Sequence, residues 1–443
     1  MMASSKLVTT LARKEVFMKR LFLVVLVMSC IFLLGRALAE DSTGISKDTI
    51  LVGAPGVYTG PGASNTVPIQ QGYKLAAKEI NDAGGIYGRK ISLRIEDTDY
   101  PPQQAIATVR RLIEKDKVFC LLGANITGNM WAILPVITEA KIPLVECLTS
   151  STIITAPFNK YIFRPNGNHW YLAWLAADLA VDHFKYKRIA LFNVTDSWGI
   201  ETMKAAKIRL KEKWGVDAVV QAEVPRTATD VAAAVLKMKQ ANPDCLISVG
   251  WATNITPLMR QSQELGLTVP HIGSSGADLQ EVMTAGKFAK GYISHMYTND
   301  LVEGDDPEMK TFREKFLKNY PDVPASLGRP GLWDVTGYIA MHLIGDTLKK
   351  IGPDPTREKF ISELEKVRNY RSLFAPITFT PTNHDGLCQY KFFKVVNEEG
   401  KREILPEWHG SLELLAQCQE RSLKEYLPSL SKEYLDMIGF RAK

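Results

Sequence analysis

The sequence predicts an α/β protein with two lobes, each built around a parallel sheet. Short apolar runs typical of strands alternate along the chain with segments of helical period, each of about 10–15 residues. Strands separated by helices of that length form βαβ units, which place the strands in parallel order. The alternation runs through two successive series, and two series predict two lobes.

The first series is expected between residues 50 and 145. Its strands are predicted at residues 50–54, 91–95, 118–122 and 142–145, and its helices at 69–81, 101–114 and 131–140. The first of these helices should stop where Asn, Asp and two glycines follow each other at residues 81–85.

The second series is expected between residues 170 and 273. Its strands are predicted at residues 188–194, 218–224, 245–249 and 271–273, and its helices at 170–184, 199–214, 231–240 and 256–265. Helices at 307–320 and 333–351, strands at 377–380 and 390–396, and a polar helical tail at 412–438 follow. Since ligands bind at the carboxyl ends of strands in such sheets, the loops there are the first place to look for a site.

The composition is that of a globular protein. The chain has 443 residues, of which 46% are hydrophobic and 23% are charged. These values exclude disorder, collagen and coiled coil as descriptions of the whole chain. At about 150 residues per domain, the length predicts two or three domains.

The first 39 residues are predicted to be a cleaved secretory signal peptide. The run 21–34 carries no charge, Lys19 and Arg20 precede it, and Ala37-Leu38-Ala39 follows it. A membrane span needs roughly 20 apolar residues, so this run is short for one. An uncleaved anchor and a lipid anchor on Cys30 remain open as alternatives, and so does translation from Met18 instead of Met1.

The leader also explains most of the net charge. The formal charge is +6, from 54 basic and 48 acidic residues. Residues 1–39 hold six of the basic residues and one of the acidic ones, which leaves +1 for the rest of the chain. A nucleic-acid partner therefore loses its support, and none is expected.

The residue patterns that mark enzymes and metal sites are missing from the sequence. The 7 histidines form no HxH or HExxH pair. The chain has no Gly-x-Ser-x-Gly elbow and no phosphate-binding loop of the Walker type. We therefore expect no catalytic residue, no metal and no cofactor. A bridge among the five cysteines after the leader stays open, without a choice of pair: Cys120, Cys147, Cys245, Cys388 and Cys418.

Residues 50 to about 396 resemble the type I periplasmic solute-binding proteins of ABC importers, in particular the leucine/isoleucine/valine-binding family. The most specific stretch is EINDAGGIYGRK within residues 72–113, and the strand and loop ILVGAPGVYTGPGA precedes it. Weaker matches are DSWGIETMKAAK, ISVGWATNITPLMRQSQELGLTVPHIGSSG and LWDVTGYIA.

The resemblance implies two Rossmann-like lobes that close on a solute and are joined by a hinge of three chain crossings. We expect the crossings near residues 164–166, 296–299 and 378–380. Lobe 1 then comprises residues 47–165 plus 299–377, and lobe 2 comprises residues 166–298 plus 378–410. Residues 411–443 form a helical C-terminal extension.

The resemblance also assigns residues to the cleft between the lobes. Thr127 falls on the family's serine whose hydroxyl binds the ligand carboxylate, and Thr149 and Ser150 fall on a loop with further polar contacts. Trp198 and Trp251 fall on aromatic residues of the second lobe. A helix cap for the hydroxyl residues and core packing for the tryptophans are the alternatives.

Departures from the family pattern leave the solute open. The family's acid that pairs with the ligand ammonium falls at Ser275, with Asp278 three residues further on. Glu146 replaces a small residue at a strand end, where it either binds a cation or points away. Asn65 stands in place of the family's tyrosine. The predicted ligand-binding set therefore comprises Thr127, Thr149, Ser150, Trp198, Trp251, Ser275, Asn65 and Glu146, and Asp196 is expected to cap the next helix instead.

These observations predict a periplasmic receptor without enzymatic activity. Its solute should be a small carboxylate-bearing molecule: a branched-chain or other amino acid, or an apolar or aromatic acid or amide. We expect a monomer whose partner is an ABC permease in the membrane. A sensing receptor of the same fold, a secreted α/β enzyme, and an anchored structural protein remain as alternatives.

Overall fold

The computed structural model describes residues 43–99, 101–275, 284–323, 330–370, 373–425 and 428. The predicted signal peptide, Asp278 and most of the chain beyond residue 425 lie outside the described residues. Within the described ranges, no helix combines the length and the apolar character that crossing a bilayer requires. The described residues from 43 onward form one compact unit, and the description below is of that unit.

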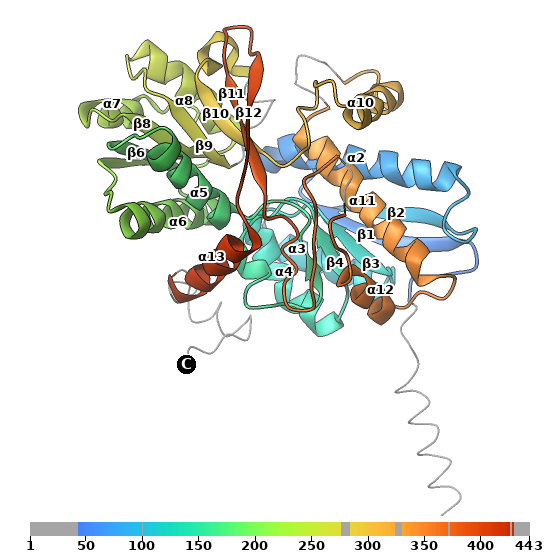
Figure 1. The fold of residues 1–443 in the computed structure, drawn as a ribbon. Coiled ribbons are helices and arrows are strands. Elements are labelled where there is room, and N and C mark those ends of the chain that lie inside the picture. Colours follow the sequence, from blue (N-terminus) through green and yellow to red (C-terminus); the bar gives the residue numbers. More distant parts are fainter. Residues whose placement is uncertain are drawn as a thin grey trace, which may run out of the picture. The chain divides into compact units, whose positions relative to one another are not determined.

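The first lobe is a parallel sheet with helices on both faces. Its five strands follow the order β2-β1-β3-β4-β5, and every neighbouring pair is parallel. The strands are β1 (Thr49–Gly56), β2 (Lys90–Asp97), β3 (Cys120–Gly123), β4 (Leu144–Glu146) and β5 (Ile162–Phe163). The helices are α2 (Ala63–Asp82), α3 (Pro102–Glu114), α4 (Thr127–Ala140), α10 (Pro307–Asn319), α11 (Leu332–Ile351) and α12 (Arg357–Leu364), with short 3-10 turns η1 (Gly60–Gly62) and η2 (Thr152–Ile154). Helices α2 and α11 cover one face of the sheet, and α3 and α4 cover the other (Figure 1).

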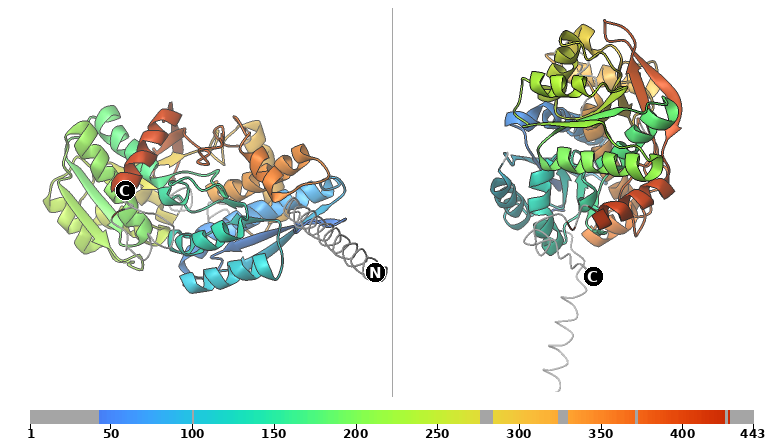
Figure 2. Two further views of the ribbon diagram at one scale, coloured as in Figure 1. Left: turned by 90° about the horizontal axis from the view of Figure 1, so that it is seen from below. Right: turned by 90° about the vertical axis from the view of Figure 1, so that its left-hand side faces the viewer.

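The second lobe has a larger sheet with an antiparallel edge. Its seven strands follow the order β12-β11-β10-β9-β8-β6-β7, and every neighbouring pair is parallel except β10 with β11 and β11 with β12. The strands are β6 (Ile189–Val194), β7 (Val220–Val224), β8 (Cys245–Val249), β9 (His271–Ser275), β10 (Tyr292–Met296), β11 (Tyr390–Val395) and β12 (Arg402–His409). The helices are α5 (His169–Asp178), continued by the π-helix η3 (Leu179–His183), α6 (Ser197–Trp214), α7 (Ala232–Gln240), α8 (Ala252–Glu264) and α13 (Leu412–Glu425), with the 3-10 turn η4 (Gly286–Ala289). Figure 2 shows helices on both faces of this sheet as well.

The central strands of the second lobe show why the sequence folds this way. Every residue of β6 and of β8 is buried, as expected for strands covered on both faces. Helix α6 follows β6 after the cap Asp196, and it ends at Gly215, whose φ of 65° lies in the left-handed region that glycine adopts readily.

The chain passes between the two sheets three times. The first passage links β5 to α5, the second follows β10, and the third lies between α12 and β11. The passing segments are paired with each other through isolated β-bridges, which join Arg164 to Asp385 and Thr298 to Phe374. They form a joint of hydrogen-bonded extended segments between the lobes.

Several predicted elements differ from the structure. The strand predicted at residues 377–380 is wrong, because Ile377 and Thr380 form only isolated bridges within local turns of the third passage. The first helix begins at Ala63, six residues before its predicted start, with Pro68 inside it. Strands β5, β10 and β12 were not predicted. The five described cysteines are all free thiols, so no bridge joins them.

Helices α2 and α11 approach so closely that glycine is required at their contact. A Cβ on Gly72 would lie 2.0 Å from the backbone oxygen of Asp334, and a Cβ on Gly337 would lie 2.0 Å from that of Ile69. Because backbone atoms cannot yield as a flexible side chain does, any side chain here pushes the two helices apart.

We therefore expect Gly72→Ala to lower the free energy of unfolding by about 2 kcal/mol, as measured by urea denaturation. Gly128→Ala is the matched control, since no atom lies within 4 Å of its added Cβ. Equal midpoints for Gly72→Ala and the unaltered protein would show that the helices separate without cost.

Candidate solute site

A small cavity of about 30 Å3 lies where the carboxyl ends of strands from both sheets face each other. Its lining comes from both lobes: Asn65, Asn125, Ile126, Thr127, Leu148, Thr149, Ser150 and Trp333 from the first, and Trp198 and Trp251 from the second. Among the described residues that line it, no side chain is charged.

Five helices reach this cavity, and each does so with its first turn or its cap. Asn65 is the third residue of α2, Thr127 is the first of α4, and Trp198 is the second of α6. Trp251 is the N-cap of α8, and Trp333 is the second residue of α11. Helix N-termini carry unpaired N–H groups and a positive partial charge, so the cavity favours an anion.

Two of the three tryptophans are held in place by contacts with each other and with a helix cap. The rings of Trp198 and Trp251 meet edge to face, with 4.8 Å between centroids and 62° between planes. Asp196 accepts hydrogen bonds from the backbone N–H of Gly199 at 2.8 Å and from Nε1 of Trp251 at 2.9 Å. The predicted capping role of Asp196 is confirmed, and the same carboxylate also orients Trp251.

Glu146 lies behind the cavity and organises the two loops that form its wall. Oε1 accepts hydrogen bonds from the backbone N–H groups of Asn125, Leu148 and Thr149 at 3.0–3.1 Å, and Oε2 accepts from Nδ2 of Asn125 at 3.0 Å. Burial raises the pKa of this carboxyl above its ordinary value, while the four N–H donors act in the opposite direction. The carboxylate therefore points away from the cavity and into the loops.

The hydroxyl residues of the wall are partly engaged with the backbone. Thr149 Oγ1 donates to the backbone oxygen of Asn125, and Ser150 Oγ donates to that of Leu148 at 3.2 Å. Thr127 lies at the start of α4 and is 9% exposed. The wall thus presents hydroxyl oxygens and helix N–H groups toward the cavity.

The structure brings six of the eight predicted ligand-binding residues to this one cavity: Asn65, Thr127, Thr149, Ser150, Trp198 and Trp251. Glu146 is buried behind them, and Ser275 is the last residue of β9, with a side chain outside the described atoms. The prediction did not include Asn125, Ile126, Leu148 or Trp333. Trp333 lies in the stretch LWDVTGYIA that carried part of the family resemblance and at the start of a predicted helix, but the resemblance assigned it no place in the cleft.

Comparison with known families shows to which family the chain belongs. A family model described as "Periplasmic binding protein" matches residues 49–401. The chain belongs to this family. The lining of the cavity is divided between the two lobes.

Individual relatives agree with this assignment. An "Amino acid binding protein" of Pseudomonas aeruginosa is 28% identical over 274 residues, which are 60% of this chain and 71% of the relative. The "Leu/Ile/Val-binding protein homolog 3" of Brucella melitensis is 25% identical over 346 residues, 78% of this chain and 91% of the relative.

Solved structures show the same fold. A solute-binding protein of an ABC transporter from Rhodopseudomonas palustris, crystallised with 3,4-dihydroxybenzoic acid, is 25% identical with a TM-score of 0.73 and covers 84% of this chain and 100% of its own. The branched-chain amino acid transporter substrate-binding protein of Streptococcus pneumoniae is 20% identical with a TM-score of 0.71, over 81% of this chain and 99% of its own.

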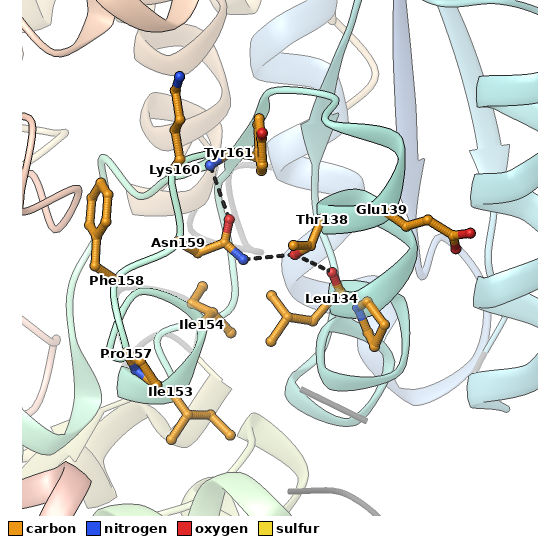
Figure 3. Close-up of a pocket in the computed structure, with 11 residues that line it drawn as sticks. Leu134, Thr138, Glu139, Ile153, Ile154, Pro157, Phe158, Asn159, Lys160 and Tyr161 are labelled. Atoms are coloured by element: carbon orange, nitrogen blue, oxygen red, sulfur yellow. Dashed lines mark hydrogen bonds between the residues drawn. The ribbon is translucent and has the colours of Figure 1, made fainter. Parts of the chain in front are cut away.

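A second, larger cavity of about 470 Å3 does not have the features of a solute site. All of its lining residues fall between Leu134 and Tyr161, so it belongs to one lobe alone (Figure 3). Two of its polar side chains already pair with each other, since Asn159 Nδ2 donates to Thr138 Oγ1 at 2.9 Å, and Thr138 donates to the backbone oxygen of Leu134. Movement of the lobes would leave this cavity unchanged.

The lobes touch beside the solute cavity. Glu201 of α6 accepts hydrogen bonds from Ser151 Oγ at 2.7 Å and from the backbone N–H of Thr152 at 3.2 Å, both in the first lobe. Nε2 of His169 lies 2.9 Å from the same carboxylate, and both side chains are fully buried. This contact joins α6 of the second lobe to the first lobe.

We expect Asp196→Ala to weaken solute binding at least fivefold, in addition to the stability lost with a helix cap, about 1 kcal/mol. The reason is that Trp251 loses the acceptor that orients it. Isothermal titration with the solute and denaturant unfolding measure the two effects.

Asp306→Ala is the matched control for this substitution. Asp306 caps α10 through the N–H groups of Glu308 and Met309 and does not line the cavity. It should lose similar stability without a change in affinity. Equal affinities of the two variants would show that the Asp196 contact does not serve the site.

Proposed function

We propose that this periplasmic binding protein is the extracytoplasmic receptor of an ABC importer and that its solute is an aromatic carboxylate. The observation that carries the proposal is the lining of the cavity: three tryptophans, five helix N-termini and, among the described lining residues, no charged side chain. Indole rings match a flat apolar body, and helix N-termini match a carboxylate.

An amino acid fits this lining less well. Its ammonium group needs a negative partner, because an unpaired buried charge is costly. The positive ends of five helices would repel it, and the nearby carboxylates of Glu146 and Asp196 are occupied by N–H donors. The Rhodopseudomonas palustris protein crystallised with 3,4-dihydroxybenzoic acid supports the choice of an aromatic acid.

Capture would work by closure of the lobes. Contacts to Trp198 and Trp251 come from one lobe and contacts to Thr127 and Ser150 from the other, so the solute gains both sets only in the closed arrangement. A ligand shifts such an equilibrium by the difference in its affinity for the two states. We further propose lobe 1 as residues 47–165 plus 299–377 and lobe 2 as residues 166–298 plus 378–410, a cleaved leader at 1–39, and a periplasmic monomer that docks on a membrane permease.

A thermal-shift screen of the purified protein tests the solute class. Benzoate and hydroxybenzoates should raise the melting temperature in a concentration-dependent way, since a ligand at 100 times its Kd stabilises by about 2.7 kcal/mol. Leucine, phenylalanine and benzamide serve as comparisons that add an ammonium or remove the negative charge. A larger shift with leucine than with any benzoate would overturn the proposal.

Removing either aromatic wall should weaken binding of the acid identified in that screen. We expect Trp198→Ala and Trp251→Ala each to raise Kd at least tenfold by titration calorimetry, because each deletes one face of the apolar wall. Trp214→Ala is a control at a tryptophan outside the cavity, where Nε1 donates to Asp178 at 2.8 Å. Unchanged affinity in both cavity variants would move the site elsewhere.

A further inference from the structure

Asn125 presents a fixed amide to the solute cavity. The residue lies between β3 and α4, is fully buried and lines the cavity. Its Nδ2 donates to Oε2 of Glu146 at 3.0 Å, and its backbone N–H donates to Oε1 at 3.1 Å. Because a carboxylate only accepts, the amide edge that faces Glu146 is the NH2 group, and Oδ1 is turned away from it.

The oxygen of this amide has no hydrogen-bond partner among the described residues. Oδ1 of Asn125 is buried and unpaired, although its own NH2 group and backbone N–H are both engaged. Buried acceptors are normally paired, because leaving one without a donor costs free energy. An unpaired acceptor in the wall of a binding cavity indicates a donor on the ligand.

A donor without a partner lies on another side of the same cavity. Nε1 of Trp333 is buried and has no acceptor within the described part of the chain. Among the buried side-chain atoms of the described lining residues, Oδ1 of Asn125 is thus an acceptor without a donor, and Nε1 of Trp333 is a donor without an acceptor. A solute that satisfies both carries a hydrogen-bond donor in addition to its acceptor oxygens.

We propose that Asn125 determines specificity by accepting a hydrogen bond from a hydroxyl group on the aromatic acid, and that Glu146 is the positioning residue that fixes the amide for this role. The inference rests on the proposed function. A hydroxyl suits the cavity better than an ammonium does, because it donates without bringing a positive charge to the helix N-termini. Its oxygen also retains lone pairs for a donor such as an indole N–H.

The test compares pairs of ligands that differ only in the donor. The purified protein is titrated with 2-, 3- and 4-hydroxybenzoate and with the matching fluorobenzoates, since fluorine is close to hydroxyl in size and cannot donate. For one ring position we expect the hydroxy acid to bind roughly 10- to 100-fold more tightly than its fluoro counterpart.

Two variants assign that preference to Asn125 and Glu146. In Asn125→Leu, the affinity for the hydroxybenzoate should come within about threefold of the affinity for the matching fluorobenzoate, and the fluorobenzoate should still bind. Glu146→Gln keeps the shape of the side chain but adds a donor, so the amide of Asn125 is free to turn. The ratio of hydroxybenzoate to fluorobenzoate affinity should fall in this variant as well. If Asn125→Leu does not fold, Glu146→Gln alone tests the proposal.

Asn129→Leu is the matched control. Asn129 is another fully buried asparagine with an unpaired Oδ1, and its Nδ2 donates to the backbone oxygen of Asp99 at 2.8 Å, but it does not line the cavity. Its substitution should cost stability and leave the hydroxy-to-fluoro ratio unchanged.

The outcomes separate this inference from the proposed function. If benzoates bind tightly but the hydroxy and fluoro acids have nearly equal affinities at every ring position, the role of Asn125 is overturned. The proposal of an aromatic-acid receptor is then unaffected. A ratio that persists in both Asn125→Leu and Glu146→Gln has the same consequences. Failure of every benzoate to bind overturns both proposals together.

Discussion

The arrangement of the whole site depends on a buried ion pair in the joint between the lobes. Arg164 of the first passage pairs with Asp385 of the third, at 0% and 2% exposure. Asp385 also accepts hydrogen bonds from Thr155 Oγ1 at 2.8 Å and from Asn168 Nδ2 at 3.0 Å. Taking two charges out of water is costly, and these extra bonds offset part of that cost. The pair ties the two passages together, and so it sets where the carboxyl ends of the two sheets meet.

Once the sheets face each other, the fold itself supplies the charge of the cavity. In a βα unit the helix starts where the strand ends, so each loop at the carboxyl edge brings a helix N-terminus with it. Five such starts converge on the described cavity without a charged side chain among its lining residues. The carboxylates of Glu146 and Asp196 lie outside the cavity lining. Glu146 holds the backbone loops of the wall in place, and Asp196 holds the indole ring of Trp251. In the proposed receptor, the backbone therefore recognises the anion, and the neutral side chains discriminate between solutes.

The sequence predicted the two-lobe fold and much of the cavity, but not the roles of particular polar groups. Alternating apolar runs and helical periods identify the parallel strands and the loops at their ends, and the family resemblance singled out Thr127, Trp198 and Trp251 within those loops. The position of Glu146 was also noticed, yet its direction depends on long-range hydrogen bonds to residue 125 that no local pattern encodes. The prediction of a strand at residues 377–380 was wrong for a related reason. Its apolar residues pack in the joint, where burial does not require a sheet.

The C-terminal helix completes the joint from outside the region that matches the family. That match ends at residue 401, whereas α13 begins at Leu412. Gln419 of this helix donates to Asp385 Oδ2 at 2.7 Å, and Leu415 and Cys418 are fully buried. The carboxylate at the centre of the joint thus takes one of its partners from the extension. Because a buried carboxylate that loses a donor becomes more costly to keep ionised, the extension contributes to the stability of the lobe junction.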